Sequence, residues 1–416
     1  MNRKGITVLL AVMLGIALTG SVGYMIWQTA GSRYQAVETA GSDEAAADAW
    51  TEAARTDGDG GAGPGEAAPG ESVSGELILE GNASGEDGLG ENSQESQQAE
   101  DGAQDGTIHL VFAGDVLLSD HVLNAYNKTG DITGVLDEGL RQEISRGDIF
   151  MVNQEFPFSN RGSAAPDKQY TFRLPPEKVS MLGEMGIDIV TLANNHALDY
   201  GTDALVDSLD ALDGAGIYHV GAGRNLNEAK ALVTMETKGK TIGFLGASRV
   251  IPVGSWNASS DRPGMLTTYD PASLVAEIKK AREICDFVVV YVHWGIERDE
   301  RPQDYQRDLG QQYIDAGADL VIGSHPHVLQ GFEYYKGKPI VYSLGNFVFG
   351  SSIPRSALLR ADWDGENVQL SMVPATSSAG YTRQVTDQAK RQEFFSYMTG
   401  ISYGVRVDEN GNIVSE

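Results

Sequence analysis

The segment 287–327 reads FVVVYVHWGIERDERPQDYQRDLGQQYIDAGADLVIGSHPH, and it decides the fold. Two short apolar runs, Phe287–Val292 and Leu320–Gly323, flank a segment of helical period, Pro302–Ala316, which begins with proline as helix starts prefer. Strand, helix and strand in succession are the pattern of an α/β protein. Histidines follow both strands directly, so the segment that sets the fold also carries candidate ligands.

The same alternation extends over residues 107–416, which we expect to form one α/β domain. Further strands are predicted at Ile108–Ala113, Ile149–Asn153, Ile187–Leu192, Leu232–Thr237, Thr241–Ala247, Pro339–Ser343 and Val368–Val373. Further helices are predicted at about Gly134–Arg146, Pro176–Met185, Thr202–Ala215 and Pro271–Ile284. Ala231–Ala247 and Val405–Val414 are predicted to form hairpins, whereas Ala357–Tyr403 shows little readable pattern.

Two further regions precede this domain. Residues 1–30 contain Arg3 and Lys4 followed by the apolar run Ile6–Trp27, which is long enough to cross a bilayer. The charges predict a signal anchor with the rest of the chain outside the cytoplasm, at the cell membrane. A cleaved signal peptide is the alternative, although the residues after the run make a poor cleavage site.

Residues 31–106 form an acidic low-complexity linker, in which Asp and Glu far outnumber the two basic residues, Arg33 and Arg55. The linker is poor in core-forming residues, so we expect a solvated tether; a specific docking role is the alternative. The whole chain of 416 residues has a formal net charge of −27, which argues against nucleic acid as a partner. The single cysteine, Cys285, excludes an intramolecular disulfide and cysteine-rich metal sites.

Polar residues cluster where the predicted strands end. Ligands of α/β proteins bind at the carboxyl ends of parallel strands, so we expect these side chains to converge at one sheet edge. Carboxylate, amide and imidazole donors together suit one or two divalent transition metals such as Mn, Zn or Fe. The two histidines around Pro326 can face one site only if the backbone bends there. The strand ends supply Asp115, Asn153, Glu155, Asn194, Asn195, His196, His293, His325 and His327.

Six motifs in order carry a family resemblance. They are Gly114-Asp115, Asn153-Gln154-Glu155, Ala193-Asn194-Asn195-His196-Ala197-Leu198-Asp199-Tyr200-Gly201, Val292-His293-Trp294-Gly295-Ile296-Glu297, Gly323-Ser324-His325-Pro326-His327-Val328-Leu329-Gln330 and Tyr342-Ser343-Leu344-Gly345-Asn346-Phe347. This series resembles the CapA family of poly-γ-glutamate capsule biosynthesis proteins, a divergent relative of calcineurin-like metallophosphoesterases. The resemblance implies a four-layer α-β-β-α sandwich of the metallophosphoesterase type.

The resemblance also implies roles for individual residues. The metal ligands would be Asp115, Glu155, Asn195, His293, His325 and His327, with Glu155 bridging, Asp115 and His327 on one metal, and His293 and His325 on the other. His196 would be the catalytic residue, contacting substrate without binding metal. Apart from the resemblance, the candidate orienting or substrate-contacting residues are Asn153, Asn194, Asp199, Trp294, Glu297 and Asn346. The alternatives are ordinary core for Trp294, exposure to solvent for Asp199 and Glu297, and turn stabilisation for Asn346.

Two departures from the family's relatives leave the activity open. Calcineurin-like enzymes usually place a histidine two residues after the first aspartate, where this chain has Leu117, and His121 is a candidate replacement. The second motif has Asn153 and Glu155 in place of the usual aspartates. The protein is therefore expected to be either a metal-dependent hydrolase or a non-catalytic scaffold subunit.

Further partners follow from the same resemblance. They are an anionic polymer or a phosphoester substrate, and membrane subunits of a polymer synthase. Three basic residues in the loop after Glu155 are candidates to meet an anionic substrate, and one aromatic residue, Tyr200, is a candidate pocket wall. The basic residues are Arg161, Lys168 and Arg173.

Overall fold

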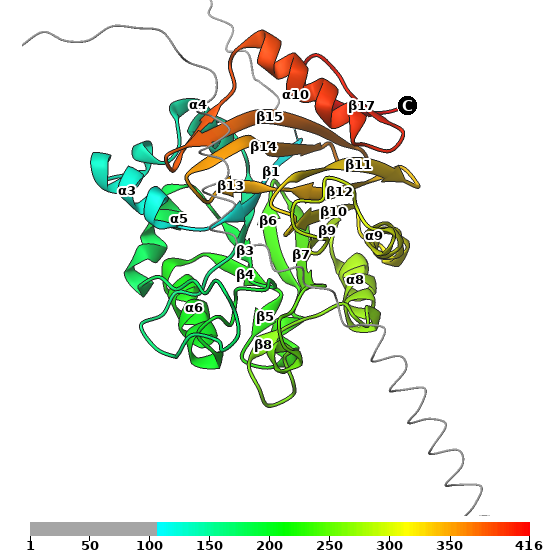
Figure 1. Ribbon diagram of the computed structural model, residues 1–416. Helices are drawn as coiled ribbons and strands as arrows, with labels where there is room; N and C mark the ends of the chain where they lie inside the picture. The colour runs from blue at the N-terminus through cyan, green and yellow to red at the C-terminus, as the bar shows by residue number, and fades with distance from the viewer. Residues whose placement is uncertain (1–105) are drawn as a thin grey trace, which may run out of the picture. The chain divides into compact units, whose positions relative to one another are not determined.

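The computed structural model describes residues 106–416, so the predicted membrane span and the linker before residue 106 lie outside the described residues. Within the described range, no helix is both long and apolar enough to cross a membrane. The strands gather into two large sheets with helices on their outer faces (Figure 1). The mixed α/β fold and the layer order helix, sheet, sheet, helix are thereby confirmed.

The larger sheet has ten strands in the order β17-β18-β15-β14-β1-β2-β3-β4, with β13 paired to β1 and β16 to β15. Strands β1 to β4 run parallel, whereas β14 joins β1 antiparallel. Its strands are β1 (Ile108–Val116), β2 (Ile149–Gln154), β3 (Ile189–Thr191), β4 (Tyr218–Val220), β13 (Asn346–Val348), β14 (Ser352–Trp363), β15 (Val368–Ser378), β16 (Tyr381–Gln384), β17 (Val405–Val407) and β18 (Asn412–Ser415).

The second sheet has six strands in the order β11-β12-β10-β9-β7-β6, of which β7, β9, β10 and β12 are parallel. The predicted hairpin at Ala231–Ala247 is confirmed as β6 and β7. The strands are β6 (Val233–Thr237), β7 (Lys240–Ser248), β9 (Phe287–His293), β10 (Leu320–Ser324), β11 (Leu329–Tyr335) and β12 (Lys338–Leu344). A separate pair is formed by β5 (Ala222–Gly223) and β8 (Gly264–Met265).

Most helices cover the outer faces of these sheets, whereas α10 (Gln388–Gly400) packs Phe394, Phe395 and Met398 into the core between them. Strand–helix–strand units such as β9-α9-β10 place each helix over its own sheet. The helices are α3 (Asp120–Thr129), α4 (Glu138–Ser145), α5 (Ser180–Glu184), α6 (Thr202–Ala215), α7 (Leu226–Ala229), α8 (Ala272–Ile284), α9 (Asp304–Ala316) and α10 (Gln388–Gly400), with 3-10 turns η1 (Ile132–Gly134), η2 (Pro176–Val179) and η3 (Gly254–Trp256).

Three apolar cores hold the layers together. One joins α4, α5 and α6 to the ten-stranded sheet, and another joins α8 and α9 to the six-stranded sheet. The third lies between the sheets, where Phe112 and Met151 meet Phe244 and Val289. A polar bond also links the sheets, because the buried Tyr291 hydroxyl on β9 donates to the carbonyl of Ala113 on β1 at 2.9 Å. That bond lies one residue from Gly114-Asp115, so it fixes the two sheets against each other beside the candidate site.

Candidate metal centre

The polar cluster predicted from the strand ends is present, but it joins two sheets rather than one. Asp115, Asn153 and Glu155 come from the ends of β1 and β2 in the ten-stranded sheet. His293 ends β9, and His325 follows β10, in the six-stranded sheet. The expectation of a single sheet edge is therefore wrong, because two sheets packed face to face bring two sets of carboxyl ends to the same place.

Glycine is required at the end of β1. A Cβ at Gly114 would lie 1.7 Å from the carbonyl oxygen of Gly345, which follows β12 in the other sheet. The neighbouring Asp115 backbone N–H donates to that same carbonyl at 2.8 Å. This close approach sets Asp115 at the junction of the two sheets, where its side chain is fully buried.

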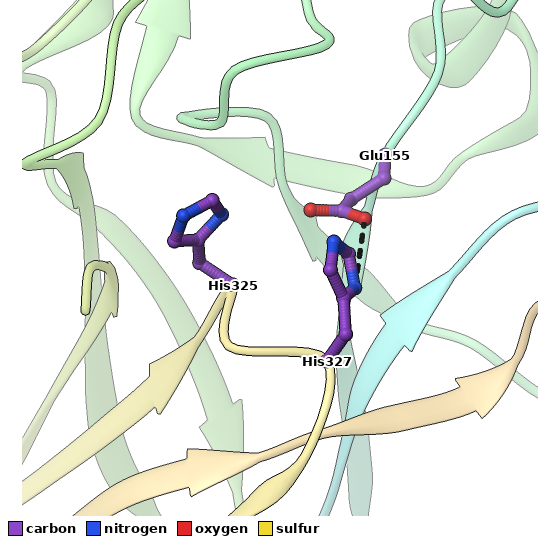
Figure 2. Close-up of side chains that lie close together, drawn as sticks. All are labelled: Glu155, His325 and His327. Atoms are coloured by element: carbon purple, nitrogen blue, oxygen red, sulfur yellow. Dashed lines mark ion pairs between the residues drawn. The ribbon is translucent and has the colours of Figure 1, made fainter. Parts of the chain in front are cut away.

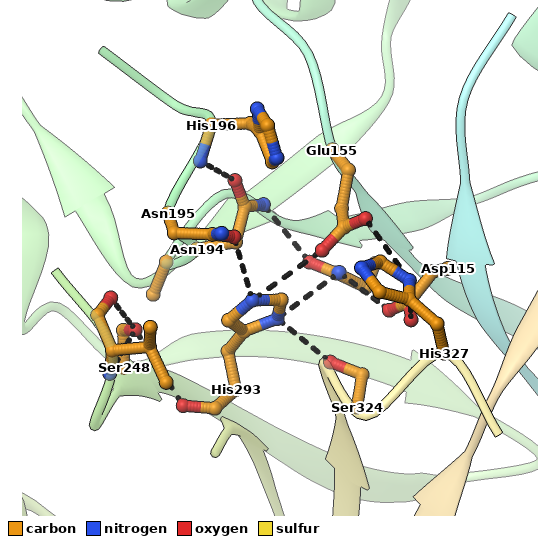
Figure 3. A network of polar contacts seen from close by, with 12 residues as sticks. Asp115, Glu155, Asn194, Asn195, His196, Ser248, His293, Ser324 and His327 are labelled. Atoms are coloured by element: carbon orange, nitrogen blue, oxygen red, sulfur yellow. Dashed lines mark hydrogen bonds and ion pairs between the residues drawn. The ribbon is translucent and has the colours of Figure 1, made fainter. Parts of the chain in front are cut away.

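Amide side chains link the carboxylate of the cluster to the loop after β3 through hydrogen bonds (Figure 3). Asn153 Nδ2 donates to Asp115 Oδ1 at 2.8 Å, and its Oδ1 accepts from Asn194 Nδ2 at 3.0 Å. Asn194 Oδ1 in turn accepts from the backbone N–H of His196 at 3.0 Å. Asn153 and Asn194 therefore orient the carboxylate and the loop after β3, while a contact between either residue and a substrate stays a prediction.

His293 lies at the centre of this network (Figure 3). Its Nε2 is 3.0 Å from Asn195 Oδ1 and 3.3 Å from Glu155 Oε1, and its Nδ1 is 3.1 Å from Ser324 Oγ. Burial, followed by the neighbouring imidazoles of His325 and His327, lowers the pKa of His293 well below its usual value. This shift favours the neutral ring, which is the form that binds a metal.

The loop between β10 and β11 turns two histidines toward one place (Figure 2). His325 and His327 have φ angles of +99° and +57°, in the left-handed region that non-glycine residues avoid. The predicted backbone bend is therefore confirmed. His327 Nδ1 lies 2.8 Å from Asn346 Oδ1, which accepts a hydrogen bond there. This contact places Asn346 beside a candidate ligand, and its role in the site stays a prediction. Burial and the imidazole of His327 lower the pKa of His325 as well.

Two groups of ligand atoms fit a metal ion, and they share Glu155. One consists of Glu155, His325 and His327; the other of Asp115, Glu155 and His293; within each group the ligand atoms lie within 4.8 Å of one another. The division of the histidines differs from the expected one, and the assignment of each ligand to one ion stays a prediction. Two buried atoms, Asp115 Oδ2 and His325 Nδ1, make no hydrogen bond within residues 106–416, as unfilled ligand positions would. The residues present therefore fit a divalent metal.

His196 stands beside this cluster and is absent from both ligand groups. Its Nδ1 lies 2.7 Å from Asp199 Oδ2 and 2.9 Å from Lys168 Nζ, and its ring packs 4.5 Å from the ring of Phe172. Lys168 also forms an ion pair with the other oxygen of Asp199. Asp199 is fully buried, so it orients His196, and any proton that His196 exchanged with a ligand would pass through Nε2.

Several candidate residues lie elsewhere. Trp294 points into the core on the helix-covered face of the six-stranded sheet and donates to the carbonyl of Tyr342 at 2.8 Å, because its side chain alternates with that of His293. Of the two alternatives for Trp294, a pocket wall or ordinary core, its position fits the core. Glu297, on the loop after β9, belongs to neither ligand group. His121 is exposed on α3 and does not replace a ligand, while Leu117 is buried in the core.

Of the predicted basic residues of the loop after Glu155, only Lys168 is turned inward, whereas Arg161 and Arg173 are exposed. Arg161 pairs with Asp207 at 2.6 Å, and Arg173 lies 4.0 Å from the ring of Tyr200, which is thereby half-buried outside the cluster. Ser324 was not among the predicted site residues, although its place at the end of β10, directly before His325, is a usable signal. Phe172, whose ring packs on His196, had no feature in the sequence that predicted this contact.

Fold and site together define an α-β-β-α protein with a candidate metal centre at the carboxyl ends of its parallel strands. The chain belongs to the family described as bacterial capsule synthesis protein PGA_cap, whose profile matches residues 109–351. The predicted family resemblance is thereby confirmed.

Named relatives agree with this assignment. The chain is 32% identical to the capsule biosynthesis protein CapA of Bacillus anthracis over 303 residues, covering 70% of this chain and 73% of that protein. It is 34% identical to the PGA biosynthesis protein CapA of Bacillus subtilis over 254 residues, covering 61% and 66%. A probable polyglutamine synthesis accessory protein of Mycobacterium tuberculosis is 34% identical, covering 50% and 57%.

Solved structures show a more distant likeness. A hypothetical protein from Thermus thermophilus has a TM-score of 0.41 and 16% identity, covering 65% of this chain and 99% of that one. A putative 5′-nucleotidase from Staphylococcus aureus has a TM-score of 0.40 and 16% identity, covering 68% and 55%. Scores this low add nothing to the family assignment.

Proposed function

We propose that this protein acts in the biosynthesis or export of poly-γ-glutamate, an anionic surface polymer, through a metal-dependent hydrolase-like site. The observation that carries the proposal is the sharing of Glu155 between two ligand groups, in which every residue except the partly exposed His327 is buried. The names of the relatives from Bacillus anthracis and Bacillus subtilis support the polymer assignment.

The donor set suits Mn, Zn or Fe, with Glu155 placed between the two groups. Such an ion, when bound, supplies Lewis acidity and lowers the pKa of bound water. Residues of the chain itself would orient the ligands and transfer the proton. Asn153 and Asn194 hold Asp115 and the β3 loop in place, and Asp199 with Lys168 fixes the ring of His196. His196 would give or take a proton at Nε2 beside a bound substrate.

A non-catalytic scaffold that binds polymer or synthase subunits is the second candidate. The observation that favours it concerns Leu117, which stands where related enzymes carry an imidazole and is 4% exposed in the apolar core. Among the described residues, His121 was the candidate to replace the missing imidazole, but it is exposed on α3 and belongs to neither ligand group. A metal site that lacks one ligand can serve to bind polymer or synthase subunits without catalysing a reaction.

The deciding experiment compares His196→Ala with Glu155→Gln in a polymer-producing bacterium that lacks its own relative of this chain. Glu155→Gln should abolish surface polymer and lower metal content, whereas His196→Ala should keep the metal. If the protein is an enzyme, His196→Ala lowers turnover by ~10²–10⁴-fold and stops polymer production. Normal polymer with His196→Ala, together with no turnover by metal-replete protein, would establish the scaffold instead. Glu366→Gln, an exposed acid on the β14–β15 turn, is the matched control.

We further propose that the domain is extracytoplasmic and attached to the cell membrane through Ile6–Trp27, as the charge pattern of the sequence supports. Protease added to intact cells should degrade the domain, and cell-associated chains should keep their amino terminus. Mature protein that starts near Gly31 and accumulates in the medium would refute the anchor.

A further inference from the structure

The amide of Asn346 lies closer to a candidate ligand nitrogen than the carboxylates of the cluster do. Its Oδ1 is 2.8 Å from His327 Nδ1, whereas Asp115 Oδ2 and Glu155 Oε2 are 3.3 Å and 3.8 Å from the same nitrogen. Figure 3 shows the ring of His327 beside both carboxylates. Nδ1 is therefore the nitrogen of His327 that faces the other donors, and one of those donors is an amide oxygen.

The backbone of two strands sets the position of Asn346. Asn346 on β13 is in parallel register with Asp115 on β1, so both side chains leave the sheet on the same face. The hydroxyl of Ser356 on β14 donates to the carbonyl of Asn346 at 2.7 Å, and the backbone N–H of Asp115 donates to the carbonyl of Gly345 at 2.8 Å. The amide is thus held next to the carboxylate by contacts that need no ion.

Strand β13 also runs beside the position where related enzymes carry an additional imidazole. The backbone N–H of Leu117 donates to the carbonyl of Val348 on β13 at 2.7 Å, while the Leu117 side chain is 4% exposed in the apolar core. Leu117 therefore offers no donor atom to the cluster. The neighbouring strand does offer one, in the amide of Asn346.

The spacing of these atoms matches that of donors around a single ion. With metal–ligand bonds of about 2.0–2.2 Å, neighbouring donors lie about 2.8–3.6 Å apart. The distances from His327 Nδ1 to Asn346 Oδ1 and to Asp115 Oδ2 fall in this range, and that to Glu155 Oε2 lies just beyond it. A hydrogen bond explains the contact of Asn346 with His327, but it leaves Asp115 Oδ2 without a hydrogen bond within residues 106–416. An ion bound among the three atoms would use all of them.

We infer that Asn346 is a ligand of the ion that His327 and Asp115 would bind. This inference rests on the metal centre of the proposed function and adds a residue to it. Without the ion, the amide oxygen accepts from Nδ1 and orients the ring; with the ion, both atoms face it. Amide oxygens serve as metal ligands in proteins, usually together with carboxylates. The assignment supplies the donor that Leu117 lacks, so it removes the observation that favoured a scaffold.

The test replaces Asn346 by cysteine, because a thiolate reports direct contact with a metal. The purified full-length protein is stripped of metal with a chelator and titrated with Co²⁺ while its absorption spectrum is recorded. Asn346→Cys should give a thiolate-to-cobalt charge-transfer band in the near ultraviolet, since a coordinating thiol is deprotonated and bonded to the ion. The unchanged protein should give none, because its single cysteine, Cys285, is buried in the core beneath α8. Asn367→Cys, exposed on the β14–β15 turn, is the matched control and should also give none.

Asn346→Ala keeps the inference testable if Asn346→Cys fails to fold, which the melting temperatures of all variants reveal. Weaker cobalt binding by Asn346→Ala does not separate the two roles, because loss of an orienting contact weakens binding as well. The visible d–d bands of the cobalt-saturated protein do separate them, since these bands depend on the number and geometry of the donors. Loss of a ligand should change the bands, whereas loss of an orienting contact alone should leave them as they are.

Three results would overturn the inference alone. They are cobalt bound by Asn346→Cys without the charge-transfer band, an equally strong band in the control Asn367→Cys, and unchanged d–d bands in cobalt-saturated Asn346→Ala. Failure of the unchanged protein to bind cobalt would overturn the inference together with the metal centre. The role in polymer production fails separately, when Glu155→Gln leaves polymer production in cells intact.

Discussion

Chelation should destabilise this protein, and Glu155 should be the residue on which the effect depends. Both ligand groups contain Glu155, so Glu155→Gln removes a charged ligand from each at once. A ligand present at a hundred times its dissociation constant adds about 2.7 kcal/mol to the free energy of unfolding. At about 2–4 °C per kcal/mol for a domain of this size class, chelation should lower the melting temperature by about 5–10 °C.

The assay is thermal unfolding with and without a chelator, paired with elemental analysis by mass spectrometry. The unchanged protein should show the full shift, and Glu155→Gln should melt at nearly one temperature in both conditions. His325→Ala removes a ligand from only one group, so it should retain part of the metal and part of the shift. Glu366→Gln serves as the control for loss of one acid. An unchanged protein that contains no metal and shows no shift when metal is added would refute the metal centre.

Three further results are expected. Gly114→Ala should cost more than the ~1–3 kcal/mol typical of overpacking, because its Cβ would lie 1.7 Å from the backbone oxygen of Gly345; thermal melting measures the loss. Asn346→Ala should weaken metal binding about 10–100-fold in a chelator competition without changing the fold, since it removes the acceptor that orients a ligating imidazole. The pKa values of His293 and His325 are lowered by burial, so the unfolded chain takes up more protons as pH falls below ~6.5. The stability of the metal-free protein should therefore decrease below that pH, and a pH-independent melting temperature between pH 7.5 and 5 would contradict the assignment.

The sequence predicted the regular parts of the fold because their apolar periodicity is strong. Thr202–Ala215 matches α6 at both ends, and nine predicted strands all correspond to observed strands. The helix expected from Gly134 begins instead at Glu138, because the Asp137 side chain accepts from the backbone N–H of Leu140 at 2.9 Å and starts the helix there.

The missed elements have weak or misleading periodicity. Strand β14 begins with polar residues and Pro354, and its pairing with β15 is irregular between Ile353 and Ser356. Helix α10 buries the adjacent pair Phe394 and Phe395, which does not read as one helical face. Tertiary packing between the sheets sets both elements, and a single sequence does not contain that information in local form.

The candidate site divides in a similar way. Strand ends mark Asp115, Glu155 and His293 because the carboxyl ends of parallel strands converge whatever the loops do. Lys168 and Trp294 are different, since their direction depends on how a loop folds back or on which face of a sheet a residue falls. Lys168 turns inward to the buried Asp199 and to His196, and Trp294 packs in the core, which was one of the two alternatives for that residue.

The strained loop at His325 and His327 bears on whether the cluster only stabilises the fold or also binds a metal. Left-handed backbone at a non-glycine residue costs of order 1–3 kcal/mol, and glycine would relieve the cost at both positions. The surroundings offset it, because the Pro326 carbonyl accepts from the Arg298 N–H at 2.8 Å and Asn346 holds the His327 ring. Those contacts stabilise the bend, yet only one of them uses an imidazole. The bend alone therefore does not account for imidazoles at both strained positions. A candidate metal site does account for them, because both rings and the carboxylate of Glu155 form one group of potential ligands.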